Sequence, residues 1–283
     1  FNNAKMRTVE LVKGIQSSVL GFGCAPILGS KGAEISRRAL ENAFDNGVTH
    51  FDLARSYGYG EAEKFVGKVF KTKRKEIILT SKFGIVANWK ANLLKPVKPV
   101  IRFLKKPKTN SDNFTPVDQN EKSVADFFHD RIEISSLQMR KNLEKSLRAL
   151  KTDYLDYFLI HEPLTSIQNI DELCDAALRL KEEGKIRAWG LAYMKSQKHL
   201  HESYLHRFDI LQFNNSPVDS DYKKVTEERS NASNIFFSPL RGSIELMNPR
   251  EKLEKLLVDY SKTVILCSMY NEKHLKENIR QAS

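Results

Sequence analysis

Short apolar runs alternate with segments of helical periodicity along most of the chain. The apolar runs are rich in β-branched and aromatic residues, and Gly, Asp, Asn or Pro tends to flank them, which is typical of strands. We predict eight strands, over residues 18–23, 48–53, 76–82, 153–160, 186–191, 208–213, 234–238 and 263–267.

The segments between these runs predict helices. The clearest is SSLQMRKNLEKSLRAL, in which Leu and Met recur at helical spacing. The predicted helices cover residues 33–46, 60–69, 134–150, 168–183, 195–205, 219–228, 250–260 and 271–280.

Eight strands that are each followed by a helix predict one domain over residues 1–283, an eight-stranded parallel (β/α)8 TIM barrel. The length of 283 residues suits this fold, which typically needs about 250. An open doubly wound sheet is the alternative. Residues 6–18 predict a short hairpin ahead of the barrel, with Gly14 in its turn.

Residues 84–130 form a long connection after the third strand, with four prolines and many lysines. Loops of this length are usually functional or disordered. Seven basic and no acidic residues lie between Lys90 and Lys108, which gives more than half of the net charge of +11. We expect a solvated flap first, attraction of an anionic ligand second and nucleic acid last, because no nucleic-acid module is readable.

Composition narrows the class of protein. An apolar fraction of 41% allows a sizeable core. The three cysteines have no metal-ligand spacing and favour a reducing, cytoplasmic compartment. No apolar run reaches the ~18 residues of a membrane span. We therefore expect a small-molecule ligand, no membrane and no metal; the oligomeric state stays open, and a monomer is compatible with the sequence.

Four polar residues stand at or just beyond the downstream ends of apolar runs: Asp52, Tyr57, Lys82 and His161. In a parallel barrel these ends converge on one face, where active sites are built. A carboxylate, a phenol, an ammonium and an imidazole on that face predict a proton-transfer site. We expect the lysine to lower the pKa of the tyrosine, so that the phenol can act as an acid.

Each residue alone has a more ordinary interpretation. Tyr57 could pack with a satisfied hydroxyl, Lys82 could be a solvated cation, and Asp52 could cap a helix. His161 could be a hydrogen-bonded residue at a strand end. Their joint occurrence at matching strand ends favours one shared site.

Seven sequence blocks resemble the aldo-keto reductase family, in the family's order and from about residue 16 to residue 279. FDLARSYGYGEAE resembles the block F-D-T-A-x-x-Y-G-x-G-x-x-E, with Leu53 in place of Thr, and LTSKFG resembles the block with the strand-three lysine. The others are SLRALKTDYLDYFLIHEP, GKIRAWGLAYM, FDILQFNNSPVD, IFFSPLRGS and TVILCSMYNEKHLKEN.

The resemblance implies a TIM barrel that reduces a carbonyl, or runs the reverse reaction, with a nicotinamide cofactor extended across its mouth. It implies Tyr57 as the general acid or base, Lys82 as the cation beside it, Asp52 as the partner of Lys82, and His161 as the donor to the carbonyl oxygen. The implied cofactor contacts are Gln212, Phe237, Ser238, Leu240, Arg241, Ser268, His274, Glu277 and Asn278.

Two departures bear on the cofactor. Ala192 and Tyr193 stand where the family commonly has Ser-Asn, so those contacts to the carboxamide are lost or replaced. Met269 and His274 replace the usual Ser and Arg of the 2′-phosphate pocket, and a neutral His binds a dianion less firmly than a guanidinium. The resemblance favours NADP(H), and NAD(H) stays possible.

Two other functions compete with an NAD(P)-dependent oxidoreductase acting on an aldehyde, ketone or sugar. One is a regulatory, redox-sensing barrel that binds the cofactor with little turnover, which the altered residues 192–193 keep open. The other is a lyase with Lys82 as a Schiff-base amine. The lyase is the weakest, because a neighbouring Asp52 would keep the amine protonated.

Overall fold

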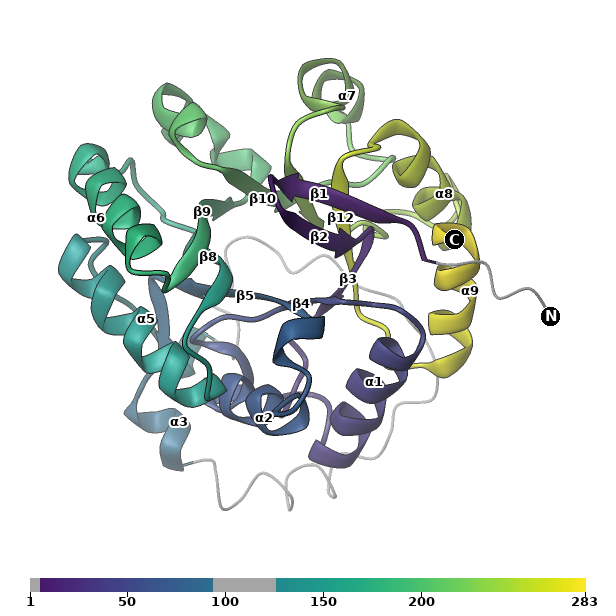
Figure 1. Cartoon of the computed structure of the whole chain (residues 1–283). Helices are drawn as coiled ribbons and strands as arrows, with labels where there is room; N and C mark the ends of the chain where they lie inside the picture. Colours follow the sequence, from purple (N-terminus) through teal and green to yellow (C-terminus); the bar gives the residue numbers. More distant parts are fainter. Residues whose placement is uncertain (1–5, 94–125) are drawn as a thin grey trace.

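The computed structural model describes residues 6–93 and 126–283 (Figure 1). Eight parallel strands close into a barrel, in the order β3-β4-β5-β8-β9-β10-β11-β12 with β12 beside β3. This confirms the predicted (β/α)8 barrel and excludes the open sheet. The strands are β3 (Leu20–Gly23), β4 (His50–Asp52), β5 (Ile78–Phe83), β8 (Leu155–His161), β9 (Ile186–Tyr193), β10 (Ile210–Asn214), β11 (Asn234–Phe237) and β12 (Thr263–Cys267).

The barrel strands are buried on both faces, which explains their continuous apolar runs. Every residue of β5 and β8 is buried, as expected for parallel strands between a packed interior and a layer of helices. Figure 1 shows that layer around the outside of the barrel. It consists of α1 (Ala33–Asp45), α2 (Ala62–Val69), α5 (Ser136–Leu150), α6 (Ile170–Glu182), α7 (Tyr222–Arg229), α8 (Pro249–Asp259) and α9 (Glu272–Ala282).

The helix predicted over residues 195–205 is wrong in type. The chain forms two 3₁₀ helices there, η4 (Lys195–Leu200) and η5 (Glu202–Arg207). The Tyr204 hydroxyl links these turns to the rest of the fold, because it donates to the Leu200 carbonyl at 3.2 Å, accepts from the Ile167 N–H at 2.8 Å and bonds the His201 ring at 2.6 Å. These contacts depend on tertiary structure that local periodicity does not reveal.

An antiparallel hairpin of β1 (Thr8–Val12) and β2 (Ile15–Ser18) precedes the barrel and lies across its amino end (Figure 1). Gly14 has φ of +80° in the turn, a conformation that glycine adopts without steric cost. Arg187, near the start of β9, donates to the Gly14 carbonyl at 2.8 Å, and Ser233, just before β11, donates to the Leu11 carbonyl at 2.6 Å. The hairpin therefore closes the end of the barrel opposite the strand ends that carry the candidate site.

The long connection after β5 contains structure that the sequence did not predict. β6 (Ile85–Ala87) pairs antiparallel with β7 (His129–Arg131), and α3 (Trp89–Leu93) follows β6. Strands of three residues have too little alternation to be read from sequence. Residues 94–125, which carry most of the basic cluster between Lys90 and Lys108, lie outside the described residues.

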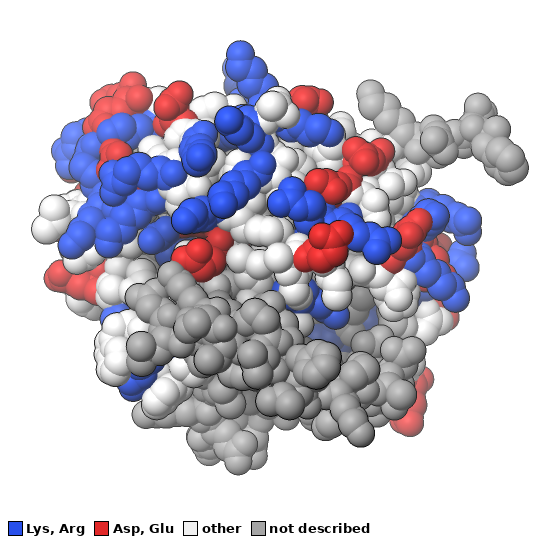
Figure 2. Space-filling model, turned by 90° about the horizontal axis from the view of Figure 1, so that it is seen from below, with Lys and Arg blue, Asp and Glu red and all other residues white. Residues whose placement is uncertain are grey.

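Basic side chains gather in patches on the described surface. Figure 2 shows Lys and Arg grouped on one part of the face seen from below, with fewer Asp and Glu among them. None of the helices in the described ranges is both long enough and apolar enough to cross a membrane.

A buried histidine stands in β4, next to the closing hairpin. His50 is fully buried, with Nδ1 at 3.2 Å from the Ser17 hydroxyl and Nε2 at 3.0 Å from the Thr80 hydroxyl. Burial, and secondarily the Lys82 charge, lower the pKa of His50 to about 3. The ring is therefore neutral in the folded protein at neutral pH.

This histidine predicts acid-dependent loss of stability. The unfolded chain takes up a proton at His50 below its ordinary pKa of about 6.5, whereas the folded protein does so only near about 3. The free energy of unfolding should therefore fall as the pH drops below 6.5, by about 2 kcal/mol from this residue at pH 5. Denaturant unfolding at pH 7.5 and pH 5 measures the loss, which should be smaller in His50→Gln.

The control is His206→Gln, at an exposed position, which should lose as much stability as the wild type between the two pH values. NMR of the wild-type ring gives a second measurement that needs no variant, since the His50 signals should stay constant from pH 7.5 to 5. Titration of those signals near pH 6.5 would contradict the prediction.

Candidate active site

Three of the four predicted catalytic residues stand at or near the downstream ends of neighbouring strands. Asp52 is the last residue of β4, Lys82 lies one residue before the end of β5, and His161 is the last residue of β8. β5 pairs with β4 on one side and β8 on the other. The barrel therefore brings these side chains to one rim, and all three are buried.

The Lys82 ammonium is the centre of the cluster. Its Nζ donates to Asp52 Oδ2 at 2.6 Å and to the Leu53 carbonyl at 2.8 Å, and it lies 3.4 Å from the Tyr57 hydroxyl. An ammonium ion has three protons to donate, and these three oxygens match them. Burial of this charge is tolerable because a carboxylate and additional acceptors compensate for the lost water.

The second oxygen of Asp52 is held from across the barrel. Gln212 in β10 is buried and donates from Nε2 to Asp52 Oδ1 at 2.8 Å. The resemblance implied Gln212 as a cofactor contact, and the bond to Asp52 is one the sequence did not predict. With both oxygens engaged, the carboxylate holds the ammonium in one place.

Tyr57 reaches the cluster from the loop after β4. Its backbone N–H donates to the Ala54 carbonyl at 3.1 Å, and three left-handed residues follow, with φ of 61° at Gly58, 59° at Tyr59 and 82° at Gly60. A Cβ at position 58 would lie 2.8 Å from the Ile27 carbonyl oxygen, so this turn needs glycine. The turn directs the phenol toward Lys82, with its ring centroid 5.9 Å from that of His161.

The pKa of Tyr57 differs from the sequence prediction. Burial raises the pKa of the phenol well above 10, and the negative charges of Asp52 and Glu162 raise it further. The expected lowering by Lys82 was wrong for the protein alone, because burial and the nearby negative charges raise the pKa instead. The hydroxyl therefore keeps its proton at neutral pH, which suits a group that donates one.

His161 is a neutral imidazole in this setting. Burial lowers its pKa well below 6.5, and the charges of Lys82 and Arg131 lower it further. Among the described residues, its Nδ1 has no hydrogen-bond partner. A neutral imidazole carries one N–H, so this ring, whose centroid lies 5.9 Å from that of Tyr57, can donate a hydrogen bond to an oxygen placed between the two.

A cavity of about 340 Å³ adjoins His161. Its wall combines charged side chains, Arg131 and Glu133, with apolar ones from the loop after β8, such as Leu164 and Ile167. Arg131 is fixed by a bond from its guanidinium to the Glu162 carbonyl at 2.5 Å. A mixed wall of this size suits a small polar molecule.

The residues implied for the cofactor lie around the rim formed by β10, β11 and β12. Phe237 ends β11 with a half-buried ring, exposed Ser238 turns the chain with φ of 52°, and Leu240 and Arg241 are half-buried. The Arg241 guanidinium forms no ion pair with any described residue. This side of the rim therefore presents an aromatic ring, a hydroxyl and a cation close together in sequence.

The remaining cofactor positions follow β12. Exposed Ser268 comes directly after the strand, and Asn271 caps α9 by accepting from the N–H groups of Lys273 and His274. His274 and Glu277 are exposed on α9, and Asn278 is half-buried. Because β11 and β12 are neighbours, both groups of residues lie on the same side of the mouth.

Sequence reasoning missed Lys252, which fixes the loop after β11. Lys252 is fully buried in α8, and its Nζ donates to the carbonyls of residues 240–243 at 3.0–3.3 Å. The Ser216 hydroxyl donates to the Arg241 carbonyl at 2.8 Å. The sequence contained an indication that Lys252 is buried. It precedes Leu256 by four residues and so lies on the apolar face of the helix.

Together the geometry provides a protonated phenol beside a buried ammonium, a neutral imidazole, a small cavity and a rim with an unpaired arginine. This combination can polarise an oxygen and give it a proton. It cannot supply a hydride, for which the chain would need a redox cofactor.

The chain is similar to proteins of one family by sequence. The model of the "Aldo/keto reductase family" matches residues 19–244. Aldo-keto reductase YhdN of Bacillus subtilis is 29% identical over 185 residues, covering 63% of this chain and 44% of that protein. Aldo-keto reductase yakc of Schizosaccharomyces pombe, whose name specifies NADP(+), is 28% identical over 178 residues, covering 61% and 42%. The matches thus span less than half the length of these relatives.

Solved structures agree on the fold. An aldo-keto reductase from Klebsiella pneumoniae in complex with NADPH superposes with a TM-score of 0.65 at 19% identity, covering 99% of this chain and 90% of that one. At this identity the likeness concerns the barrel alone. The family model, which spans most of the barrel and all four clustered residues, shows that this chain belongs to the aldo/keto reductase family.

Proposed function

We propose that the protein is an NADP(H)-dependent oxidoreductase that reduces the carbonyl group of a small aldehyde, ketone or sugar, or runs the reverse reaction. The observation that carries this proposal is the Tyr57 hydroxyl, 3.4 Å from the buried Lys82 ammonium. The neutral His161 ring, with its centroid 5.9 Å from that of Tyr57, supports it. The oxidoreductase relatives, one of them named for NADP(+), support the reaction class and the cofactor.

The rim residues fit a dinucleotide. The unpaired Arg241 guanidinium suits a pyrophosphate, and the half-buried Phe237 ring offers an apolar face to a nicotinamide. Ser238, Leu240, Ser268, His274, Glu277 and Asn278 would hold the rest, as the resemblance implies. When bound, the cofactor supplies or accepts the hydride at the carbonyl carbon.

The chain's own residues perform the proton chemistry. His161 donates a hydrogen bond to the carbonyl oxygen and orients it, and Tyr57 passes its hydroxyl proton to the same oxygen as negative charge develops there. Lys82 stabilises the phenolate that remains, since its Nζ lies beside the hydroxyl. Asp52 and Gln212 keep that ammonium in position.

The choice between NADP(H) and NAD(H) depends on the residues near the start of α9. Met269 is buried, which leaves exposed His274 as the replacement for a phosphate-binding arginine. The side chains thus favour NADP(H) less strongly than the relatives do. We propose NADP(H) as the preferred cofactor, with NAD(H) as a weaker substitute.

A redox-sensing barrel with little turnover is the second candidate. Ala192 and Tyr193 are both buried, and the Tyr193 ring packs against Phe213 with centroids 5.5 Å apart. These residues therefore offer no exposed substitute for a Ser-Asn pair. The lyase alternative has less support, because Lys82 Nζ donates to Asp52 at 2.6 Å and to the Leu53 carbonyl at 2.8 Å and so is not presented as a free amine to a substrate carbonyl.

Tyr57→Phe should abolish most turnover. The substitution removes the proton donor and keeps the ring, so kcat/KM for aldehyde reduction should fall by about 10²-fold or more. The dissociation constant for NADPH, measured by quenching of tryptophan fluorescence, should change less than about threefold, because the hydroxyl acts on the substrate.

The matched control is Tyr154→Phe, since Tyr154 stacks on Arg74 at the opposite end of the barrel. It should retain the wild-type kcat/KM. Full activity in Tyr57→Phe would reject the acid role. NADPH binding by the wild type without reduction of any aldehyde, ketone or sugar in a panel would favour the redox-sensing alternative.

Lys252→Met should weaken cofactor binding specifically. Without the ammonium, four carbonyls lose their shared donor and the loop with Arg241 loosens. The dissociation constant for NADPH should rise about tenfold or more, in line with the loss of a buried charged hydrogen bond, while kcat at saturating NADPH stays within about threefold.

Lys255→Met, in the same helix but bonded to Asp259 near the surface, is the control and should leave NADPH affinity unchanged. Equal NADPH affinity in Lys252→Met and the wild type would show that the loop after β11 does not depend on this clamp.

A further inference from the structure

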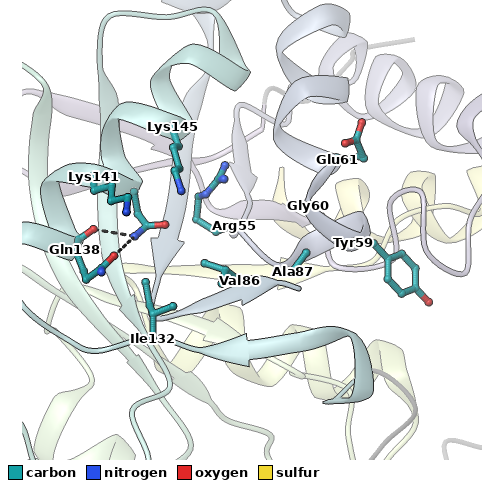
Figure 3. Close-up of a pocket in the computed structure, with 11 residues that line it drawn as sticks. Arg55, Tyr59, Gly60, Glu61, Val86, Ala87, Ile132, Gln138, Lys141 and Lys145 are labelled. Atoms are coloured by element: carbon teal, nitrogen blue, oxygen red, sulfur yellow. Dashed lines mark hydrogen bonds between the residues drawn. The ribbon is translucent and has the colours of Figure 1, made fainter. Parts of the chain in front are cut away.

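A second cavity lies apart from the loops after β11 and β12. It has a volume of about 380 Å³, is open to the surface, and is bordered by α5, by the loop that follows Tyr57 and by the β6–β7 pair (Figure 3). Its wall is mostly polar, and Val86, Ala87 and Ile132 form its apolar floor. The catalytic scheme uses none of these residues.

Three cations line this cavity: Arg55 after β4, and Lys141 and Lys145 on α5. Figure 3 shows Lys145 and the Arg55 guanidinium directed into the same space. Of the described residues that line the cavity, Glu61 is the one with an acidic side chain. Neither Lys141 nor Lys145 forms an ion pair with another described residue.

Arg55 is held in place but not fully used. One terminal nitrogen bonds Glu63, whose other oxygen accepts from the Ser81 hydroxyl at 2.6 Å. The Nε of Arg55 is buried without a hydrogen-bond partner among the described residues. A buried donor left without a partner is costly, and an anion in the cavity that Arg55 lines would compensate the charge of this guanidinium.

The lysines are close enough to disturb each other. Burial lowers the pKa of Lys145, and the charges of Arg55, Lys141 and Arg148 lower it further. Repulsion of this kind is relieved when an anion enters between the cations. The amide side of Asn142 is occupied by Gln138, so the cations remain the main ligand-binding groups of the wall.

We propose that this cavity is a binding site for a compact anion of the phosphate-monoester class, held by Arg55, Lys141 and Lys145. The planar guanidinium suits a tetrahedral dianion, and two ammonium groups add charge from the opposite wall. The volume leaves room for a small organic group beside the phosphate. The inference is independent of the proposed oxidoreductase function.

Calorimetric titration with inorganic phosphate and methyl phosphate tests the site on the whole protein, with sodium chloride at matched ionic strength as the blank. Saturable binding of both phosphates is expected, and it should weaken as salt rises. The double variant Lys141→Gln/Lys145→Gln should weaken binding about tenfold or more. Both lysines are exposed, so the fold should tolerate their replacement.

Two control variants locate the anion. Lys68→Gln removes one positive charge from α2, at an exposed position outside the cavity. It should retain the wild-type affinity for phosphate. Arg241→Gln removes the cation of the proposed cofactor loop and should also retain it. Absence of saturable phosphate binding, unchanged affinity in the double variant, or loss of binding in Arg241→Gln alone would overturn the proposal. Because no arm measures turnover or NADPH, failure here leaves the oxidoreductase proposal untouched.

Discussion

The buried contact between Lys82 and Asp52 is the interaction on which the site depends. Two charges that are almost fully withdrawn from water are tolerable only when each is matched, and here both carboxylate oxygens and three acceptors around the ammonium are engaged. Removal of either partner would leave an uncompensated charge in the barrel. The pair thus fixes the position of the Lys82 ammonium at the rim of the barrel. The phenol, the imidazole and the small cavity lie around this charge.

The two ends of the barrel have different roles. At the amino end the hairpin, the buried His50 and the bonds from Arg187 and Ser233 close the interior. At the carboxyl end the loops diverge, and their conformations are set by buried side chains such as Lys252. These loops include the left-handed run at residues 58–60, which carries the chain away from Tyr57.

The barrel and the clustered residues could be predicted from the sequence more completely than the contacts that surround them. All eight strands were predictable because burial on both faces makes each an apolar run, and Asp52, Lys82 and His161 were predictable because they stand at or beside the strand ends. The 3₁₀ turns at 195–207 were not, since they are held by contacts such as that of the Tyr204 hydroxyl with Ile167, which local periodicity does not show. The raised pKa of Tyr57 was also missed, because it depends on burial and on the nearby charges of Asp52 and Glu162 in the folded protein. The bonds from Gln212 to Asp52 and from Lys252 to the loop join elements distant in the fold, which no local pattern shows.

Transfer of label from NADPH deuterated at C4 to the carbonyl carbon of an aldehyde tests the central claim most directly. The wild type should give an alcohol that carries the deuterium, and Lys82→Met should bind NADPH yet form labelled product about 10²-fold or more slowly, because the phenol loses its charged neighbour. Labelled product at the wild-type rate in Lys82→Met, or none from the wild type with any aldehyde, would contradict the account.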